Sequence, residues 1–456
     1  MKRILTLALT AVCIGLTALL TVTGCSKENP VEPEPEPAPA AGELAGFICP
    51  PYTLDRNEII DSVLDLVKTL LPISTDDESI LKSLLASLFR HDVTVAKVEY
   101  YTTGVDGSTV KASGAILWPS EVTASGRYDR IVSVTHGTVD IDSAPTTETL
   151  PVETICSVFH KTKNQIVLIA DYLGYGSSRT ADLQHPYLHT ELTGKTCADL
   201  LEAAQSYISD SLRFVPSDPR DPIQLCGYSQ GGHGAIATLF ELQKRGMADR
   251  VTRVDAGAGP QDLMAMEQAL VGMKGEPYNT MGYLAYFFRG IIYGNSLDVD
   301  PENIYAPEVF QENADGIVPY DLFSTAMLST WHQALGTDVT KVLHADFFDE
   351  NPAVTASDDV KTILATIDEI SNVNFAVPSN PSIITFYHSP LDDQVPYICS
   401  VNAHEKWPGS SFVNLSLGAG DHATCLLEYS FRLLDDNEAA IWTNISTSLQ
   451  SFSGAK

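Results

Sequence analysis

Short aliphatic runs that alternate with longer helical patterns constrain the fold of this chain more than any other feature. Each run is followed by a loop that contains Gly, Ser, Asp or His; the runs are Ile131–Val134, Ile166–Ala170, Ile223–Cys226, Ile383–Phe386 and Phe412–Leu415. Strands buried on both faces read as continuous aliphatic runs, and strands that alternate with helices indicate a parallel sheet with helices on both faces. Because ligands bind beyond the carboxyl ends of parallel strands, we expect the functional site where these loops gather.

Two further patterns precede these strands. Apolar residues recur three or four apart over 54–72 and 77–90, which predicts two amphipathic helices. Their polar faces are acidic or neutral, so packing against the domain explains them better than binding to a membrane surface does. From Thr94 to Leu117 the period changes to two around the turn Asp106-Gly107, and this change predicts a hairpin.

The strand pattern lapses between Pro260 and Pro378. We assign about 261–378 to a mostly helical cap that is inserted into the sheet domain. The aromatic run from Tyr283 to Phe288 has two interpretations. It either fills the core of the cap, which we favour, or lines an acyl pocket.

Metal-binding patterns are weak in this sequence. Asp298, Asp300 and Glu302 have the spacing of a calcium loop, but its glycine and closing glutamate are out of register, so a solvated loop is the better interpretation. No CxxC pair or paired Cys/His spacing indicates zinc. We therefore expect no structural metal and no cofactor. The disulfide pairing stays open for six cysteines: Cys49, Cys156, Cys197, Cys226, Cys399 and Cys425.

The first residues read as an export signal. Lys2 and Arg3 precede an apolar run over 4–20, and the segment closes on VTGC, with the cysteine at position 25. This ending resembles the lipobox of bacterial lipoproteins, which implies a signal peptide over 1–24, lipid attachment at Cys25 and a membrane anchor at the cell envelope, periplasmic or on the cell surface. An ordinary signal peptide with a chance cysteine is the alternative. Pro, Glu and Ala over 25–46 predict an extended tether before a domain over 47–456.

The charge balance excludes one class of partner. The chain has 28 Lys and Arg against 58 Asp and Glu, a formal net charge of −30. Phosphate backbones and anionic headgroups are bound by clusters of basic residues, and none is present here. We therefore expect no nucleic-acid partner, whereas the sequence leaves the oligomeric state open.

Ser229 stands in the GxSxG pentapeptide Gly227-Tyr228-Ser229-Gln230-Gly231, between a predicted strand and the helical stretch Ala235 to Lys244. The pentapeptide alone is a weak signal, but strand, sharp turn and helix together are what a nucleophile elbow requires. The backbone N–H of Gln230, at the start of the helix, would face a developing oxyanion. A phosphate-binding loop is the competing interpretation, and we discount it because no Lys follows the glycines.

A second oxyanion donor is expected after an earlier strand. Ile131–Val134 leads into Thr135-His136-Gly137-Thr138, and we predict that the backbone of Thr138 supplies this donor. His136 itself is better interpreted as a structural hydrogen-bonding group than as a base.

The ordered set HGT, DYLGYGSS, GYSQGG, AGAGP, LDDQVP and GAGDH, spread over about 94–430, resembles the α/β-hydrolase superfamily and more loosely its secretory lipase group. The resemblance implies a catalytic triad in the chain order Ser, acid, His, and it selects Ser229, Asp392 and His422. Asp393 is the fallback for the acid. The remaining histidines are interpreted as surface or satisfied structural groups: His185, His189, His332, His344, His388 and His404.

The resemblance implies a serine hydrolase of carboxylic esters, an esterase or a lipase, and it leaves the acyl chain and the alcohol open. An exported serine exopeptidase of the same fold is the first alternative. It would need acidic groups in the cap to hold a substrate amine, and Glu267, Glu276 and Glu302 are the candidates. A tethered binding protein that lost the chemistry is the second alternative, and the apparently complete triad argues against it.

Overall fold

The computed structural model describes residues 38–70, 75–139, 150–160, 162–180, 184–323, 328–415 and 420–435. The predicted signal peptide, Cys25 and most of the predicted tether lie outside these ranges, and so does Gly418-Ala419 of the loop before His422. Within the ranges, no helix combines the length and the apolar character that a bilayer crossing requires.

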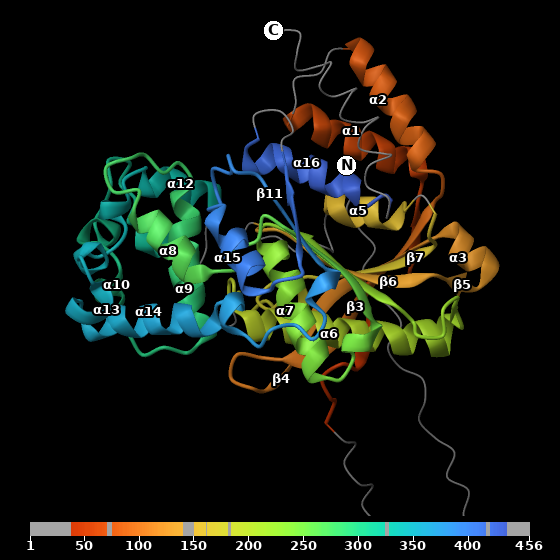
Figure 1. Cartoon of the computed structure of the whole chain (residues 1–456), viewed down its shortest axis with the longest axis horizontal. Coiled ribbons are helices and arrows are strands. Elements are labelled where there is room, and N and C mark those ends of the chain that lie inside the picture. The colour runs from red at the N-terminus through yellow and green to blue at the C-terminus, as the bar shows by residue number, and fades with distance from the viewer. Residues whose placement is uncertain are drawn as a thin grey trace, which may run out of the picture. The chain divides into compact units, whose positions relative to one another are not determined.

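A ten-stranded mixed sheet forms the centre of the domain (Figure 1). Its strands are β1 (Leu44–Phe47), β2 (Tyr52–Leu54), β3 (Val93–Thr103), β4 (Thr109–Pro119), β6 (Arg130–Thr135), β7 (Gln165–Ala170), β9 (Ile223–Tyr228), β10 (Val251–Gly257), β11 (Ile384–His388) and β12 (Ser411–Asn414). The strand order is β1-β3-β4-β7-β6-β9-β10-β11-β12, and β2 also pairs with β3. A separate two-stranded ribbon pairs β5 (Arg127–Tyr128) with β8 (Val215–Pro216).

The sheet divides into an antiparallel and a parallel part. Pairs that involve β1, β2, β3 and β4 are antiparallel, and every pair from β7 to β12 is parallel. In the parallel part the carboxyl ends of neighbouring strands lie within one residue of each other: Thr135 pairs with Gly227, Tyr228 with Gly257, Gly257 with Tyr387, and His388 with Asn414. The loops that leave β6, β9, β11 and β12 therefore start from one edge of the sheet.

Helices cover both faces of the sheet because successive strand residues point to opposite sides. In β7, Ile166 belongs to the apolar cluster shared with α6 (Thr190–Ser206) and α7 (Gln230–Lys244). Its neighbour Val167 belongs to the cluster on the other face. The helices of that second cluster are α1 (Arg56–Leu70), α2 (Thr75–Leu88), α5 (Val152–Val158) and α16 (His422–Arg432). The predicted mostly parallel sheet with helices on both faces is confirmed.

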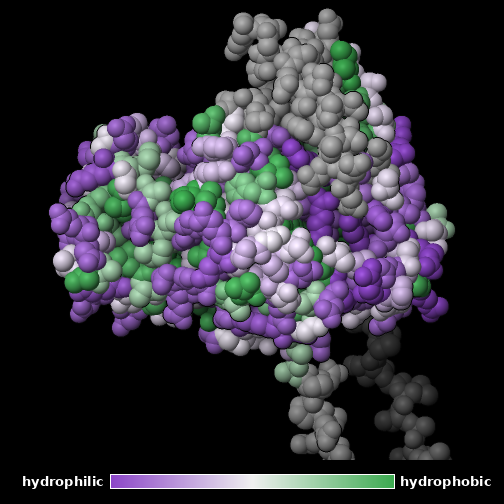
Figure 2. All heavy atoms as spheres, in the orientation of Figure 1, coloured by the Kyte–Doolittle hydropathy of each residue, from purple (hydrophilic) through white to green (hydrophobic). Residues whose placement is uncertain are grey.

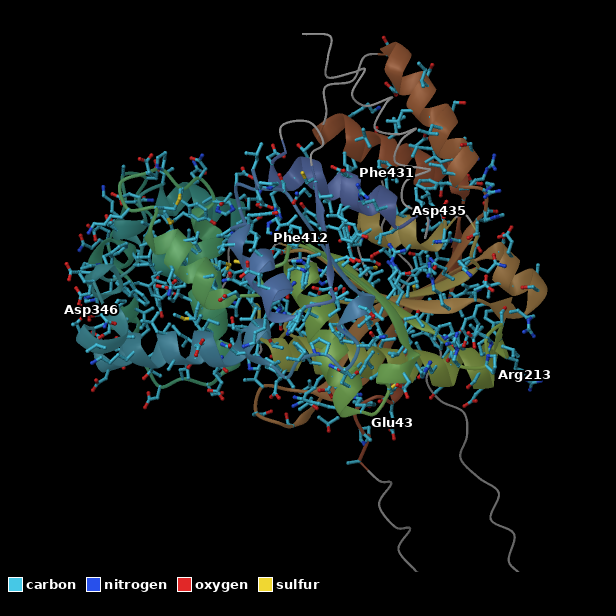
Figure 3. The ribbon with its side chains drawn as sticks, viewed as in Figure 1. Glu43, Arg213, Asp346, Phe412, Phe431 and Asp435 are labelled. Atoms are coloured by element: carbon cyan, nitrogen blue, oxygen red, sulfur yellow. The ribbon has the colours of Figure 1, made fainter. Side chains whose placement is uncertain are left out.

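The cap follows β10 and consists of helices and short turns, as predicted. Its helices are α8 (Leu263–Val271), α9 (Met281–Gly294), α10 (Pro301–Ile304), α11 (Pro319–Leu322), α12 (Leu328–Leu335), α13 (Pro352–Thr355) and α14 (Asp358–Ile370), with 3-10 turns η4 (Pro307–Phe310), η5 (Val339–Lys341), η6 (Ala345–Phe348) and η7 (Asn372–Asn374). They enclose an apolar cluster of their own. Figure 1 shows these helices grouped to one side of the sheet, and in Figure 3 Asp346 marks the cap while Arg213 marks the opposite end of the view. The cap surface in Figure 2 mixes apolar and hydrophilic side chains.

The remaining elements connect these layers. They are the helices α3 (Ser120–Ser125) and α15 (Ile398–Lys406), the π-helical turn η2 (Tyr207–Leu212), and the 3-10 turns η1 (Gly176–Ser178), η3 (Ala248–Arg250) and η8 (Pro381–Ile383). At the edge of the sheet, β1 pairs with β3 from Leu44 onward. The sheet thus includes the last three residues of the segment 25–46, whose composition predicts a tether.

Candidate active site

Ser229 occupies a strained turn between β9 and α7. Its φ of 60° and ψ of −125° lie outside the regions that a residue with a side chain normally adopts. The turn is held by a hydrogen bond of 2.8 Å, which the Ser229 N–H donates to the Gly257 carbonyl at the end of β10. Strand, turn and helix are therefore arranged as a nucleophile elbow requires.

Two glycines after Ser229 let α7 approach the sheet. A Cβ at Gly231 would lie 2.0 Å from the Thr135 carbonyl oxygen of β6, and a Cβ at Gly232 would lie 2.3 Å from the Gly257 carbonyl oxygen of β10. Both distances are far below van der Waals contact, so any larger residue would push α7 away from the sheet. Glycine is therefore required at both positions by the close packing of α7 against the sheet.

Asp392 and His422 are hydrogen-bonded to each other. Nδ1 of His422 lies 2.6 Å from Oδ2 of Asp392, and both side chains are almost fully buried. The other carboxylate oxygen accepts backbone N–H bonds from Gln394 at 2.9 Å and Val395 at 2.8 Å. Burial alone would raise the pKa of Asp392, but His422 and His388 hold it well below its usual value. Asp392 therefore remains an anion that orients the imidazole.

His422 is placed beside the elbow by Tyr228, the residue before Ser229. The two rings lie 5.0 Å apart between centroids. The Tyr228 hydroxyl donates a hydrogen bond of 2.9 Å to the His422 carbonyl. His422 begins α16, so the last strand and its helix bring the imidazole to the edge where β9 ends.

Asp393, the fallback acid, has a different contact. Its Oδ1 accepts the backbone N–H of His422 at 3.2 Å, and the residue is exposed. It therefore holds the main chain of His422, whereas Asp392 holds the ring.

His388 is a second imidazole on the Asp392 carboxylate. Its Nε2 lies 3.3 Å from Asp392 Oδ2 and 3.1 Å from the Val395 carbonyl, and its Nδ1 lies 2.8 Å from the Ser400 hydroxyl. A neutral ring with the proton on Nε2 satisfies all three neighbours. The sequence predicts a structural histidine here, and its position at the end of β11, four residues before Asp392, is the signal that points to a role at the site.

Both predicted oxyanion residues line one pocket together with Ser229. Gln230 is the first residue of α7, where backbone N–H groups have no partner within the helix. Thr138 follows the end of β6, and its hydroxyl lies 2.8 Å from the Tyr187 hydroxyl. The turn before Thr138 is supported by Tyr172, which stacks on His136 at 4.0 Å and donates a hydrogen bond of 3.0 Å to the His136 carbonyl.

The side chain of Gln230 is fixed by His185. Its amide nitrogen lies 2.6 Å from Nε2 of His185, and Nδ1 of the same ring lies 2.7 Å from the Leu173 carbonyl. Burial lowers the pKa of His185 to about 3, so the ring is neutral and accepts the amide proton at Nε2. His185 is thus a satisfied structural group that braces the start of α7.

The pocket at Ser229 is narrow. It leaves about 30 Å³ for the centres of water molecules. Its other walls come from the end of β10, the cap and the acid loop: Tyr187, Pro260, Met266, Leu270, Tyr278, Tyr283, Phe287, Gln394 and Val395. An adjoining groove of about 390 Å³ shares Leu270, Tyr278 and Gln394 with the pocket. This groove lies between the cap and the loop that carries Asp392.

The aromatic run of α9 is mainly core, as we favoured. Tyr286, Phe287 and Phe288 all belong to the cap core, where the ring of Phe288 meets Phe347 edge-on at 5.0 Å. Tyr283 and Phe287, which lie four residues apart and so on one face of the helix, also line the pocket at Ser229.

The cap carboxylates proposed for an exopeptidase do not line the pocket at Ser229. Glu276 and Glu302 are exposed, and Glu267 is buried in α8, where burial raises its pKa to about 7. None of the described residues that line the pocket at Ser229 is acidic.

The remaining predictions concern histidines, metals and thiols. The four other histidines named above have structural partners: His189 and Leu192, His332 and Gly282, His344 and Asp346, and His404 and Ser410. No group of three metal-ligating side chains occurs in the part of the chain that the structure describes. The six cysteines left open above are all free thiols.

Glu153 is a buried acid that sequence reasoning missed. It lies on α5 and is 3 % exposed. Burial raises its pKa to about 7, and hydrogen bonds from the backbone N–H groups of Glu153 and Gly137 oppose this shift. The carboxyl therefore supports the turn that leads to Thr138. An acid in the first turn of a helix usually complements the helix dipole, so the sequence carries no signal for this contact.

Comparisons with known proteins rest on structure. No family model and no curated protein matches the sequence. A Legionella pneumophila protein classed as a candidate hydrolase superposes with a TM-score of 0.66 at 21 % identity, over 86 % of this chain and 97 % of that one. The rice cell wall degrading esterase LipA from Xanthomonas oryzae gives 0.62 at 19 %, over 91 % and 100 %. Candida antarctica lipase A gives 0.54 at 13 %, over 84 % and 78 %.

The chain has an α/β-hydrolase fold. At identities this low, the likeness extends to the fold alone. The chemistry of the site has to be argued from its own residues.

We predict that Glu153→Gln changes how stability depends on pH. A raised pKa in the folded state means that stability from this carboxyl is present below its unfolded pKa of about 4.5 and is lost as pH rises through about 7. Glutamine stays neutral, so above pH 8 the variant should be more stable than the wild type by about 2 kcal/mol, and the difference should shrink towards pH 5. Urea unfolding at several pH values measures it. The exposed Glu276→Gln should show no such trend, and a constant difference for Glu153→Gln would contradict the assignment.

Proposed function

We propose that this chain is a serine hydrolase that cleaves carboxylic esters through an acyl-enzyme on Ser229. The observation that carries the proposal is the buried 2.6 Å hydrogen bond between Asp392 and His422, at the edge of the sheet where the strained turn of Ser229 also lies. An anion that orients an imidazole beside a serine on such a turn is the constellation of nucleophilic acyl transfer. The fold of the structural neighbours is compatible with this chemistry.

In the first half-reaction His422 removes the proton of the Ser229 hydroxyl as Oγ attacks the ester carbonyl carbon. The carbonyl oxygen becomes an oxyanion, and the backbone N–H groups of Gln230 and Thr138 stabilise its charge. Asp392 stabilises the cationic form of His422. The tetrahedral intermediate collapses when His422 returns the proton to the leaving alkoxide, which departs as the alcohol.

In the second half-reaction water takes the place of the alcohol. His422 accepts a proton from the water, whose oxygen attacks the acyl carbon and forms a second oxyanion in the same site. The bond to Ser229 Oγ breaks, and the proton on His422 goes to the serine. The products are the carboxylic acid and the free enzyme.

The walls of the site suit an ester better than a peptide with a free amine. The lining of the Ser229 pocket includes apolar and aromatic side chains such as Leu270, Phe287 and Val395, and none of its described members is a carboxylate that would bind an ammonium group. We therefore place esterase or lipase activity ahead of exopeptidase activity.

We also propose that the protein is exported and anchored to the cell envelope through lipid on Cys25. The proposal rests on the charged and apolar segment 1–20, the VTGC ending and the Pro/Glu-rich residues that follow. It is independent of the proposed chemistry.

Asp392→Asn should abolish most of the activity, because asparagine leaves His422 in the wrong tautomer. For a triad acid we expect a loss in kcat of about 10⁴-fold, measured with p-nitrophenyl butyrate. Asp393→Asn is the matched control, because its carboxylate contacts only the main chain of His422 in the described part of the chain, and it should lose less than about tenfold. If the two variants lose activity equally, or Asp393→Asn loses more, the assignment of the acid is wrong.

A comparison of substrates separates the three functions. We expect hydrolysis of short p-nitrophenyl esters or triglyceride emulsions, and labelling of Ser229 by a fluorophosphonate probe that peptide mapping locates. Ser229→Ala should remove both. Hydrolysis confined to aminoacyl anilides would favour the exopeptidase, and no hydrolysis or labelling by any probe would favour the binding protein.

Cys25→Ser should release the protein from the membrane. The wild type, expressed in a bacterial host fed radioactive palmitate, should carry the label and sediment with membranes. The variant should carry no label, whereas Cys49→Ser should behave as the wild type. A labelled Cys25→Ser protein would rule out attachment at this cysteine.

A further inference from the structure

Arg289 is a half-buried cation on α9 whose guanidinium lies against aromatic rings. Its guanidinium carbon lies 5.3 Å from the ring centroid of Tyr286 and 5.5 Å from that of Trp331. One terminal nitrogen donates to the Phe323 carbonyl. Its Nε is buried and has no hydrogen-bond partner among the described residues. No carboxylate in the described ranges lies within ion-pair distance of it.

Several other partly buried arginines hold carboxylates. Arg245 lies 2.8 Å from Asp199, and Arg250 lies 2.6 Å from Asp221. A cation that is withdrawn from water without an anion loses hydration that the protein does not replace. Arg289 is thus a guanidinium whose donor capacity is largely unused, in a chain with a formal net charge of −30.

Arg289 lines a hollow of about 610 Å³ in the cap. The other walls are mainly aromatic and aliphatic, and they include Ile292, Tyr293, Leu297, Tyr305 and Phe323. Such walls accept an apolar or aromatic body, while the guanidinium fork matches the two oxygens of a carboxylate.

Two further features of the hollow describe the kind of ligand and its place relative to Ser229. Asp298, an exposed residue, also lines the hollow, and its charge opposes ligands that carry several negative charges. None of the described residues of this hollow lines the pocket at Ser229, so the two sites are separate. One chain of contacts connects them: Arg289 lies over Tyr286, Tyr286 stacks on Tyr187 at 4.6 Å, and the Tyr187 hydroxyl lies beside that of Thr138.

We propose that this hollow is a second binding site, which takes a monocarboxylate with an apolar or aromatic body and pairs its carboxylate with Arg289. The carboxylate of the ligand pairs with the part of the guanidinium that lines the hollow, and the body of the ligand lies against the apolar walls. Binding at this site involves no chemical step, so this proposal does not depend on the hydrolysis proposed above.

Calorimetric titration of the full chain with 3-phenylpropionate, and with the uncharged 3-phenylpropionamide, tests the proposal. We expect saturable binding of the acid at least about tenfold tighter than that of the amide, since a charge-assisted bidentate pair distinguishes the two. Arg289→Met, which keeps the length of the side chain, should weaken binding of the acid by about tenfold or more, and Arg289→Lys by less. Arg220→Met, which removes an exposed arginine paired with Asp218, is the matched control and should bind as the wild type does.

Leu297→Trp provides a second, independent variant. It fills the hollow and leaves the guanidinium in place, so it should also abolish binding, and it decides the question if Arg289→Met does not fold. Near-ultraviolet circular dichroism verifies the fold of each variant. Equal binding of the acid by wild type and a folded Arg289→Met or Leu297→Trp protein would place the acid elsewhere, including the pocket at Ser229, and would overturn the proposal. A wild type that shows no saturable binding at millimolar acid would overturn it as well.

Discussion

The close approach of α7 to the sheet is the constraint on which the site depends. Ser229 is held at positive φ because the strand before it and the helix after it are both packed against the ends of β6 and β10. Gly231 and Gly232 permit distances that a side chain would forbid. The packing of the surrounding sheet offsets the cost of this backbone conformation, since a strained residue persists only where its neighbours hold it in place.

The register of the parallel strands converts distant sequence positions into one site. β6, β9, β11 and β12 end along the same edge, so each short loop after them delivers one polar group. The supports behind these groups come from elsewhere. His388 and Ser400 brace the acid loop, while Glu153 braces the turn that leads to Thr138. The loops carry the polar groups, and rigid elements set their positions.

Sequence patterns predicted the parts of the fold whose signal is local. The strand before Ser229 reads as an aliphatic run and the helix after it as a helical stretch, and both occur. The sequence did not predict β10, because Arg253 and Asp255 interrupt its apolar pattern. These two residues pair with each other at 2.8 Å, and the Asp255 carboxylate also accepts a hydrogen bond from Gln224. A buried polar network is invisible to a search for hydrophobic runs.

The features of the site that the sequence did not predict depend on contacts between side chains that are far apart in the sequence. Adjacent carboxylates look alike in a sequence, and the order of motifs was the reason for choosing Asp392 over Asp393. In the structure their contacts differ, because the side chain of Asp392 is buried and Asp393 is exposed. For His388, which we interpreted as structural, the position four residues before Asp392 is the one sequence signal of their contact, and spacing alone does not show that the ring meets that carboxylate. In α9 the helical period places Tyr283 and Phe287 on one face, but only the fold shows that this face reaches the pocket.

The narrowness of the pocket beside Ser229 bears on where a substrate would lie. The pocket leaves about 30 Å³ for the centres of water molecules, which is room for roughly two waters, whereas the adjoining groove has about 390 Å³. In the reaction proposed above, the ester carbonyl would enter the pocket and most of the substrate would lie in the groove between the cap and the loop that carries Asp392. Leu270 of α8 lines both spaces, so this helix of the cap would meet both parts of the substrate.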